Sequence, residues 1–369
     1  MVAIQTNRER FVRVFSGAEV DHIPFLDIMG FWDSCLVRWK KEGLAQDADA
    51  ETVRRIVGFE GGLGYFLPVN ALAWPAYELQ VIRREGEKTF SRNPWGAIEL
   101  NLEGSQHLPI TVEGPVKDRK SWDEYKERLQ PNMPQRLPDD WETLCAQAAQ
   151  SGDPVYTGEL PIGFFGTIRE LMGYEQAVLL FYDDPSLMDD ILDTLCDLWI
   201  SVYTQVYDDI HLDYFYIWED MCFKTGPLIS PATFRRFLLP RYQRFTDALR
   251  AVGCANILVD SDGDMRKLVP LWIEGGVNIT FPWESQFGLD VTEVRRQYPG
   301  LGMIGGVNKY ALRGGRDVID QELKKVPFML ESGRYIPGLD HGVPDDVSWS
   351  DYCYFYDRLR ELIFRYSAH

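Results

Sequence analysis

Acidic and amide side chains recur at the points where short apolar stretches of this sequence end. Each stretch has the composition of a buried strand, and the polar residue follows it at once. The polar residues in these places are Asp27, Glu159, Glu219, Asp220, Asp260, Glu284, Asn308 and Asp340. In a barrel of parallel strands all such ends meet at one face, where the active sites of barrel enzymes lie. The pattern therefore predicts an acidic site assembled from several strands.

Two aspartates and one histidine have the spacing of a metal site or an acid–base site. Asp260 and Asp262 are two residues apart, so their carboxylates point the same way on an extended chain. His341 comes directly after Asp340, at the end of the last apolar stretch. Two carboxylates and an imidazole can hold Zn²⁺, whereas crowded carboxyl groups can form an acid–base pair with a raised pKa. A structural, hydrogen-bonded histidine would explain His341 equally well.

Strand-like and helix-like stretches alternate from residue 154 onwards. The expected strands span 154–159, 213–219, 255–260, 277–284, 301–307 and 333–340, and a last helix spans 348–367. Asp184-Pro185 and Ser230-Pro231 each place a capping side chain before a proline, which is typical of a helix start. Strict alternation indicates parallel strands joined by right-handed crossovers.

The first 150 residues add further elements to this repeat. We expect helices over 7–15, over 33–42 and within 121–150, and a short strand over 23–27. Short alternating segments over 76–112 predict a β-rich insertion. Eight strand–helix units fit a closed (β/α)₈ TIM barrel. We therefore expect one domain over 1–369, with an N-terminal helical extension and the β-rich insertion. An open doubly wound sheet is the alternative.

The composition restricts the partners of the protein. Lys and Arg number 38 and Asp and Glu 56, so the net charge is −18, and such a surface repels the phosphate backbone of nucleic acids. No uncharged apolar run approaches the ~18 residues of a membrane helix, and the N-terminus has no secretory signal. Six cysteines without a C-x-x-C pair are typical of reduced thiols. These features indicate a cytoplasmic protein.

Several short motifs, taken together in order and spacing, resemble the uroporphyrinogen decarboxylase superfamily from end to end. They are Asn7-Arg8-Glu9-Arg10-Phe11, Val20-Asp21-His22-Ile23-Pro24, Ile229-Ser230-Pro231 with Phe234 and Pro240, Asp262-Gly263, Gly305-Gly306, and Ile336-Pro337 before Asp340-His341. The resemblance implies a (β/α)₈ barrel, in agreement with the alternation of strands and helices.

The sequence departs from the true decarboxylases of that superfamily. Those enzymes carry an early Arg-Gln-Ala-Gly-Arg loop that holds the acidic side chains of the substrate. Here Met29-Gly30-Phe31-Trp32-Asp33 stands in that region, and no arginine occurs between Asp21 and Arg38. An acidic mouth would also repel a polyanionic porphyrinogen. The resemblance therefore favours the other branch, the corrinoid-dependent methyltransferases.

The thiol-methylating members of that branch bind Zn²⁺ through a His-X-Cys-Gly motif and a later cysteine. Asp260-Ser261-Asp262-Gly263 corresponds to the motif here, and His341 to the later cysteine. A zinc ion held by oxygen and nitrogen ligands would polarise the oxygen of an ether or alcohol substrate better than it would activate a thiol substrate. The resemblance thus implies that a methyl group moves from an O-methyl small molecule, an ether or an alcohol, to a corrinoid carried by a partner protein.

Individual residues receive roles in this hypothesis. Asp260, Asp262 and His341 hold a possible Zn²⁺, and His341 also takes part in catalysis. Glu219 is a fourth ligand or the general acid, and Glu284 is a further catalytic candidate that orients the substrate. Asp27, Trp218, Trp283 and Asn308 are the expected substrate-binding residues. Both tryptophans could equally be core residues.

Three other functions stay open on the sequence alone. The first is a uroporphyrinogen decarboxylase-type lyase. The second is a glycoside hydrolase, whose two carboxyl groups would come from Glu159, Glu219 and Glu284. The third is a relative that binds a corrinoid or another ligand without turning it over. A homodimer formed through the outer helices is compatible with such a barrel.

Overall fold

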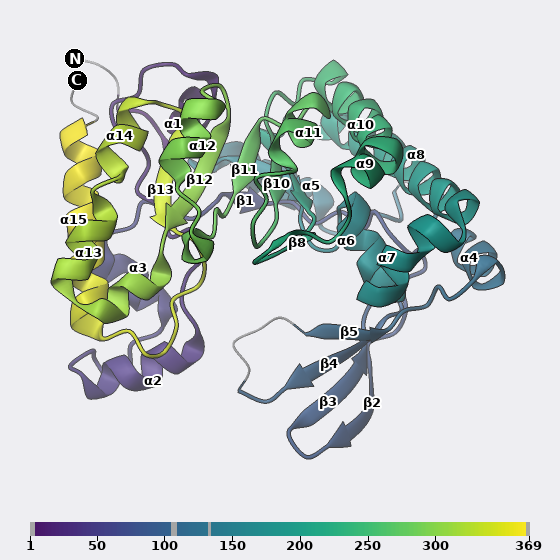
Figure 1. The fold of residues 1–369 in the computed structure, drawn as a ribbon, viewed down its shortest axis with the longest axis horizontal. Helices are drawn as coiled ribbons and strands as arrows, with labels where there is room; N and C mark the ends of the chain where they lie inside the picture. Colours follow the sequence, from purple (N-terminus) through teal and green to yellow (C-terminus); the bar gives the residue numbers. More distant parts are fainter. Residues whose placement is uncertain (1–3, 105–108, 132–133, 367–369) are drawn as a thin grey trace.

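Seven parallel strands form the centre of the protein. The computed structural model describes residues 4–104, 109–131 and 134–366, and within them the strand order is β1-β6-β7-β10-β11-β12-β13. These strands are β1 (Tyr65–Phe66), β6 (Val155–Gly158), β7 (Tyr214–Trp218), β10 (Ile257–Asp260), β11 (Ile279–Phe281), β12 (Gly302–Val307) and β13 (Tyr335–Leu339). Nearly all of their residues from β6 onwards are buried, because helices cover the curled sheet (Figure 1).

A short segment after helix α1 (Asn7–Ser16) lies between the two outer strands of this sheet. Leu26 forms a parallel bridge with Gly61, shortly before β1, and Phe31 forms one with Val343, shortly after β13. The strand expected over 23–27 is reduced to these isolated bridges because the chain turns at Asp27, whose carboxylate accepts a hydrogen bond from the Gly30 N–H. The fold is therefore TIM-barrel-like, and closure by a full eighth strand stays a prediction.

Helices follow the strands along the chain. They are α6 (Phe164–Met172), α7 (Tyr174–Asp183), α8 (Pro185–Asp209), α10 (Leu239–Ala251), α11 (Val269–Glu274), α12 (Val291–Gln297), α13 (Arg316–Leu323), α14 (Val326–Glu331) and α15 (Trp349–Tyr366). Both expected caps form, since Asp184 accepts a hydrogen bond from Leu187 N at 2.9 Å and Ser230 from Thr233 N at 3.0 Å. A π-helical turn precedes Pro240, which has no N–H to donate.

Apolar side chains fill both faces of the sheet. On the outer face, Phe245 of α10 contacts Phe215 of β7, with ring centroids 5.1 Å apart. On the inner face, Phe11 of α1 (Asn7–Ser16) stacks on Tyr214 at 4.9 Å. Helix α1 also packs against Gly302, the first residue of β12, so it covers the end of the sheet where the strands begin. The site must therefore lie at the opposite end.

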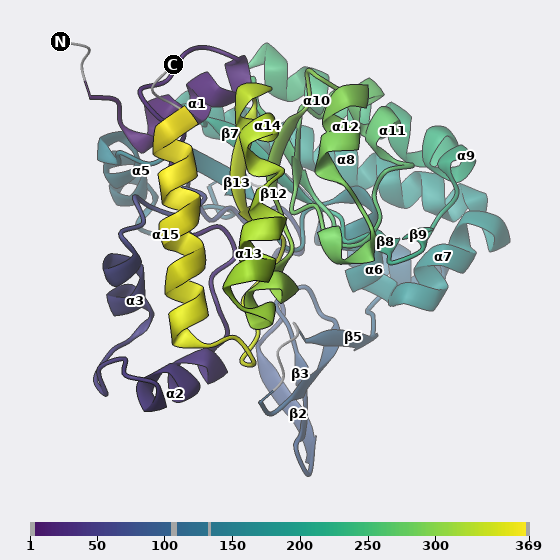
Figure 2. The same ribbon diagram turned by 60° about the vertical axis from the view of Figure 1, so that its left-hand side comes forward.

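The C-terminal helix holds the N-terminal helical extension in place. Helix α15 lies against α13, α14 and α3 (Ala50–Val57) (Figure 2). Trp39 of α2 (Asp33–Lys41) packs on Tyr352 of α15, with centroids 4.5 Å apart, and its indole N–H donates to Val347 O at 3.0 Å. No helix in the described ranges combines the length and the apolar character that crossing a membrane requires.

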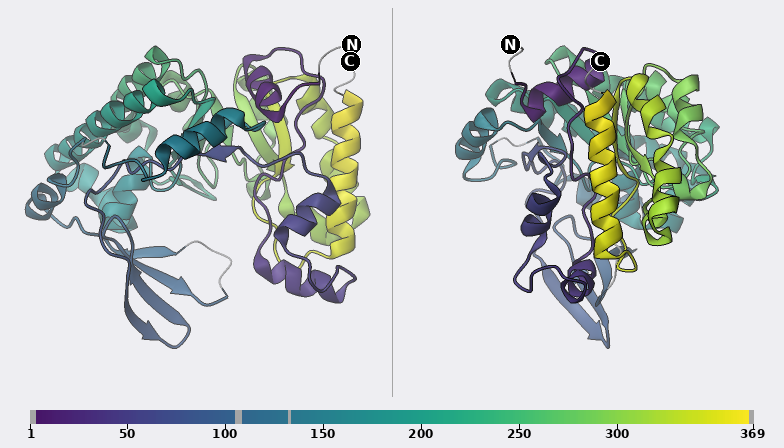
Figure 3. Two further views of the ribbon diagram at one scale, coloured as in Figure 1. Left: turned by 180° about the vertical axis from the view of Figure 1, so that it is seen from behind. Right: turned by 90° about the vertical axis from the view of Figure 1, so that its left-hand side faces the viewer.

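An antiparallel sheet of four strands projects from the body of the protein (Figures 1 and 3). Its strands, in spatial order, are β2 (Gln80–Glu85), β3 (Lys88–Arg92), β4 (Ile98–Leu102) and β5 (Ile110–Glu113). This sheet corresponds to the β-rich insertion expected over 76–112. Helices α4 (Arg119–Lys126) and α5 (Trp141–Gln150) follow it. Helices α3, α7 and α14 and strand β1 have no counterpart among the expected elements.

Asp340 ties the ends of three neighbouring strands together. It follows β13, is fully buried, and accepts hydrogen bonds from Ser285 N at 2.9 Å and Lys309 N at 3.0 Å. The two donors lie in the segments that follow β11 and β12. Burial raises the pKa of Asp340 to about 7. Its carboxylate therefore has a structural role and leaves the neighbouring His341 to face the site.

We expect Asp340→Asn to lower the free energy of unfolding by ~1–3 kcal/mol at pH 5, where the buried carboxyl group is protonated and the native and variant side chains are both uncharged. One amide nitrogen would face a buried N–H donor and leave it without an acceptor. Urea denaturation followed by tryptophan fluorescence measures the change. Asp47→Asn, at an exposed position, should stay within about 0.5 kcal/mol of the wild type. Equal losses in the two variants would contradict the structural role of Asp340.

Candidate active site

A cavity of about 560 Å³ opens where β7, β10 and β13 end. One side of it is acidic and the other is apolar and aromatic. The acidic residues are Glu99, Glu170, Asp220, Asp260 and Asp262, and the apolar and aromatic ones include Met29, Phe31, Trp32, Tyr174 and Trp218. Thr111, His341 and Arg169 also line it, and the projecting sheet contributes Glu99 and Thr111. The cavity thus lies at the face where the sequence pattern predicted a convergent site.

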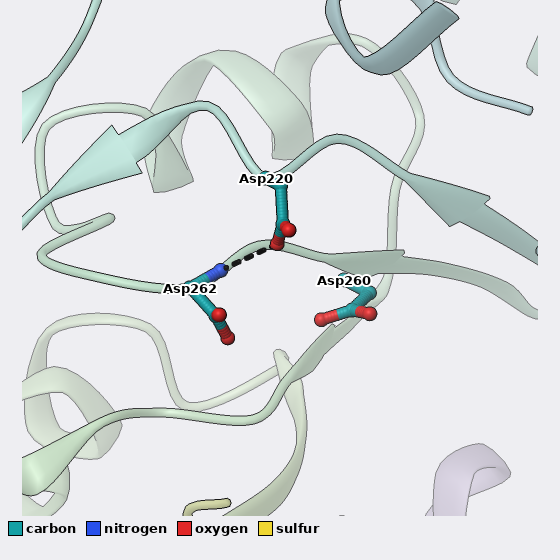
Figure 4. Close-up of side chains that lie close together, drawn as sticks. All are labelled: Asp220, Asp260 and Asp262. Atoms are coloured by element: carbon teal, nitrogen blue, oxygen red, sulfur yellow. Dashed lines mark hydrogen bonds between the residues drawn. The ribbon is translucent and has the colours of Figure 1, made fainter. Parts of the chain in front are cut away.

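Three carboxylates converge inside this cavity. One oxygen from each of Asp220, Asp260 and Asp262 lies within 4.8 Å of the other two (Figure 4). The backbone of Asp220 has a positive φ of 42°, a conformation that aspartate tolerates better than most residues. The intervening Ser261 points away, because its Oγ accepts a hydrogen bond from Met221 N at 3.2 Å. The alternation of side chains beyond β10 therefore brings Asp260 and Asp262 together.

The three carboxylates lie close together, and few positive charges or hydrogen-bond donors offset their negative charge. Burial raises the pKa of Asp260 and of Asp262 well above the ordinary value, and the charges of neighbouring carboxylates raise both further. Burial also raises the pKa of Asp220. The Tyr216 hydroxyl donates to Asp260 at 2.6 Å, and the backbone N–H of Asp262 donates to Asp220 at 3.3 Å. These two bonds fix the positions of the carboxylates without neutralising them.

His341 lies beside this cluster. Its Nε2 is 3.8 Å from an oxygen of Asp262, and its Nδ1 accepts a hydrogen bond from Gly342 N at 2.8 Å. With Nδ1 as the acceptor, a neutral ring carries its proton on Nε2. This tautomer turns an N–H toward the carboxylates, where it can stabilise their negative charge.

Arg169 brings the opposite charge into the cavity. Its guanidinium contacts the faces of two rings, 4.2 Å from the centroid of Trp218 and 4.6 Å from that of Tyr174. It donates to the backbone oxygen of Asp220 at 2.9 Å and approaches the carboxylate of the same residue at 3.7 Å. Among the described lining residues, it is the only one with a permanent positive charge. Five carboxylates thus share one guanidinium.

Glu219 lies outside the cavity, because its side chain points to the opposite side of the chain from those of Trp218 and Asp220. Its carboxylate accepts hydrogen bonds from the first backbone N–H groups of α6, those of Phe164, Phe165 and Gly166, at 2.7–2.9 Å. The hydroxyl of Tyr242 donates to it as well. Burial raises its pKa to about 7 in spite of these bonds. In this position Glu219 anchors α6 and does not reach a substrate in the cavity.

Two of the expected catalytic and substrate-binding residues are used in local hydrogen bonds. Glu284 accepts from Gly263 N at 2.7 Å and from the Gln286 side chain at 2.6 Å, so it supports the loop that carries Asp262. Asn308 caps the 3₁₀ turn Lys309–Gly314 by accepting from Tyr310 N. Neither residue lines the cavity.

Of the three remaining residues that were expected to bind the substrate, two make hydrogen bonds elsewhere and one lines the cavity. Asp27 accepts from the Arg54 guanidinium at 2.8 Å, and Trp283 is fully buried with its indole N–H donating to Thr280. Only Trp218 lines the cavity. Arg169 was not singled out from the sequence, because an arginine inside a helix gives no signal of its own.

Comparison with known proteins agrees with this architecture. The model of the family described as uroporphyrinogen decarboxylase (URO-D) matches residues 113–362. Among solved structures, a methyltransferase from Methanosarcina mazei aligns over 96% of this chain and 99% of its own, with a TM-score of 0.61 and 14% sequence identity. At that identity the likeness shows the fold alone. No curated protein matches the sequence.

We expect Asp220→Asn to lower the apparent pKa values of Asp260 and Asp262, because the substitution removes a negative charge from beside them. Carbon-13 NMR titration of the aspartate carboxyl groups measures the change. Asp264→Asn, on the same loop and paired with Arg266 at 2.7 Å in the wild type, is the control and should leave both values in place.

The same shifts make stability depend on pH. A carboxyl group whose folded-state pKa is raised stabilises the protein below its unfolded pKa, near ~4, and loses that contribution as the pH rises through the folded value. The wild type should therefore lose more stability above pH ~4 than Asp220→Asn does. An identical pH profile for the two proteins would show that the carboxylates do not interact.

Proposed function

The chain belongs to the uroporphyrinogen decarboxylase family, and on that premise we propose that it is a methyltransferase. It takes a methyl group from an O-methyl small molecule, an ether or an alcohol, and passes it to a corrinoid carried by a separate protein. The cluster of Asp220, Asp260 and Asp262 in a cavity with aromatic walls carries the proposal. The fold shared with a protein named as a methyltransferase supports it.

The residues of the cavity suit the departure of an oxygen. When a methyl–oxygen bond breaks, the electron pair stays on the oxygen, which then needs a proton. The carboxyl groups of Asp260 and Asp262 have raised pKa values, so they hold a proton at higher pH than ordinary aspartates and can donate it. The Nε2–H of His341, 3.8 Å from Asp262, would stabilise the carboxylate that remains after the proton has left. A bound corrinoid supplies the nucleophile that accepts the methyl group.

The same cluster has the donor set of a divalent-cation site. Three carboxylate oxygens within 4.8 Å of one another suit Mg²⁺ or Mn²⁺, and Zn²⁺ accepts oxygen ligands as well. Burial, and then the charge of neighbouring carboxylates, raises the pKa values of Asp260 and Asp262, and such an ion would offset that negative charge. Asp220, Asp260 and Asp262 would hold it in their ionised form, and it would then polarise the leaving oxygen in place of a proton from Asp260 or Asp262. His341 could be a ligand only after its ring turned, because Nε2 carries the proton in the present arrangement.

The two alternative enzyme functions have less support from the geometry. Uroporphyrinogen is a polyanion, and a cavity lined by five carboxylates repels it. A glycoside hydrolase needs two carboxyl groups facing one sugar. Of its candidates, Glu219 is bound to α6, Glu284 to Gly263, and Glu159 accepts a hydrogen bond from Tyr156. None of the three lines the cavity.

We expect the purified protein to bind one divalent cation, and Asp262→Ala to abolish that binding while the fold stays intact. Removing one of three carboxylates takes away a ligand from the cluster. Elemental analysis and calorimetric titration with Mn²⁺ and Zn²⁺ measure the binding, and circular dichroism checks the fold. Asp264→Asn should bind as the wild type does. Unchanged metal content in Asp262→Ala would refute the metal assignment.

We expect the wild type to form methylcobalamin when cob(I)alamin is offered as the methyl acceptor and 2-methoxyphenol or methanol as the donor. Asp260→Asn and Asp262→Asn should slow this reaction by at least ~10²-fold, the range for loss of an acid catalyst. The absorbance of methylcobalamin measures the rate, with Asp264→Asn as the matched control. A wild type that demethylates no oxygen compound under these conditions would argue against the proposed function.

A further inference from the structure

Tyr216 on β7 contacts the carboxylate cluster although it does not line the cavity. It pairs with Leu258 between β7 and β10, and Asp260 lies two residues further along β10. Side chains two residues apart on a strand share one face, so the ring of Tyr216 and the carboxylate of Asp260 lie on the same face of the sheet. The hydroxyl donates to Oδ2 of Asp260 at 2.6 Å. This bond fixes one of the two oxygens of that carboxylate.

The neighbours of Tyr216 hold it in place. The residue is only 5% exposed, and its ring centroid lies 6.1 Å from that of Tyr156. Its backbone oxygen accepts a hydrogen bond from Glu159 N at 3.0 Å. Gly158 approaches the same oxygen so closely that a Cβ at this position would lie 2.0 Å from it. The hydroxyl of Tyr216 therefore has a fixed position relative to Asp260.

The bond from Tyr216 is the shortest contact between the cluster and a donor in the described part of the chain. Asp220 accepts a backbone N–H at 3.3 Å. Arg169 and His341 lie 3.7 and 3.8 Å from carboxylate oxygens of the cluster, which is beyond hydrogen-bond distance. Asp260 is thus the carboxylate whose orientation is determined most strongly by another side chain.

Small and large divalent cations use carboxylates differently. Mg²⁺ requires an octahedron of about six oxygens at short distance, whereas Ca²⁺ takes about six to eight oxygens and often both oxygens of one carboxylate. Mn²⁺ accepts the octahedral arrangement of oxygens as well. Oδ2 of Asp260 already accepts a short hydrogen bond, so this carboxylate has one oxygen to offer to an ion and not two.

We propose that Tyr216 determines which cation the cluster binds. By holding one oxygen of Asp260, it limits this carboxylate to binding through the other oxygen, and so it favours a small octahedral cation, Mg²⁺ or Mn²⁺, over Ca²⁺. Tyr216 is a positioning residue in this inference, because it acts through Asp260. The inference rests on the metal site of the proposed function, but it requires neither a methyl donor nor a corrinoid.

The ratio of two binding constants tests this inference. Calorimetric titration of the chelator-treated protein with Mn²⁺ and with Ca²⁺ gives both dissociation constants. The wild type should bind Mn²⁺ at least about tenfold more tightly than Ca²⁺. Tyr216→Phe keeps the ring and removes only the hydroxyl, so it should lower this preference about tenfold, within the range for loss of a hydrogen bond to a metal ligand. A merely structural role of Tyr216 would weaken both cations alike and leave the ratio unchanged.

Tyr214→Phe is the matched control. Tyr214 lies on the same strand and the same face, and its hydroxyl donates to the backbone oxygen of Leu63 at 3.0 Å, away from the carboxylates. The variant should keep the wild-type ratio. Asp262→Ala should bind neither cation, which would locate the titrated ion at the cluster. Circular dichroism checks the fold of each variant.

The outcomes separate this inference from the proposed function. An unchanged ratio in Tyr216→Phe, or a wild type that binds Ca²⁺ as tightly as Mn²⁺, would overturn the inference and leave the metal assignment in place. The wild-type ratio decides the matter even if Tyr216→Phe does not fold. A wild type that binds neither Mn²⁺ nor Ca²⁺ would also overturn the inference, and the metal assignment with it if Zn²⁺ did not bind either. A Tyr216-dependent preference in a protein that demethylates no oxygen compound would keep the inference and refute the function.

Discussion

Crowding of negative charge is the constraint around which the strand-end face is built. Five carboxylates line one cavity with a single guanidinium among them, and Arg169 is held in place by Trp218 and Tyr174 and by the backbone of Asp220. Such an arrangement costs stability, because burial and mutual repulsion both disfavour the ionised carboxylates. Proteins tolerate costs of this kind mainly at functional sites. The charge also determines what the cavity can accept: a proton, a metal ion or a neutral molecule, but not a polyanion.

Other carboxylates provide the support that keeps this cluster in place. Glu219 accepts hydrogen bonds from the N-terminus of α6, where the helix dipole favours a negative charge. Asp340 joins the segments after β11 and β12, and Glu284 holds the loop that carries Asp262. The acids at the strand ends therefore divide into two groups, one that faces the cavity and one that fixes the backbone around it.

The acidic cavity has a neighbour of different character. A cavity of about 520 Å³ lies where β1 and β6 end, its walls are mainly apolar, and Leu160 lines both cavities. Only Arg136 and Asp139 among its described lining residues carry a charge. The strand-end face therefore holds an acidic and an apolar environment side by side.

The sequence by itself determined the six parallel strands β6, β7, β10, β11, β12 and β13 and the polar character of the strand ends, because hydrophobic periodicity and capping residues are local signals. It could not determine which strand-end side chains face the cavity. Glu219 and Asp220 are adjacent and both acidic, and only the bonds to α6 turn one outward and leave the other with Asp260 and Asp262. The direction of a side chain beyond a strand depends on such distant partners, and so does the position of Arg169. For the same reason the expected strand at 23–27 became a turn at Asp27, and only the folded chain placed two cavities side by side.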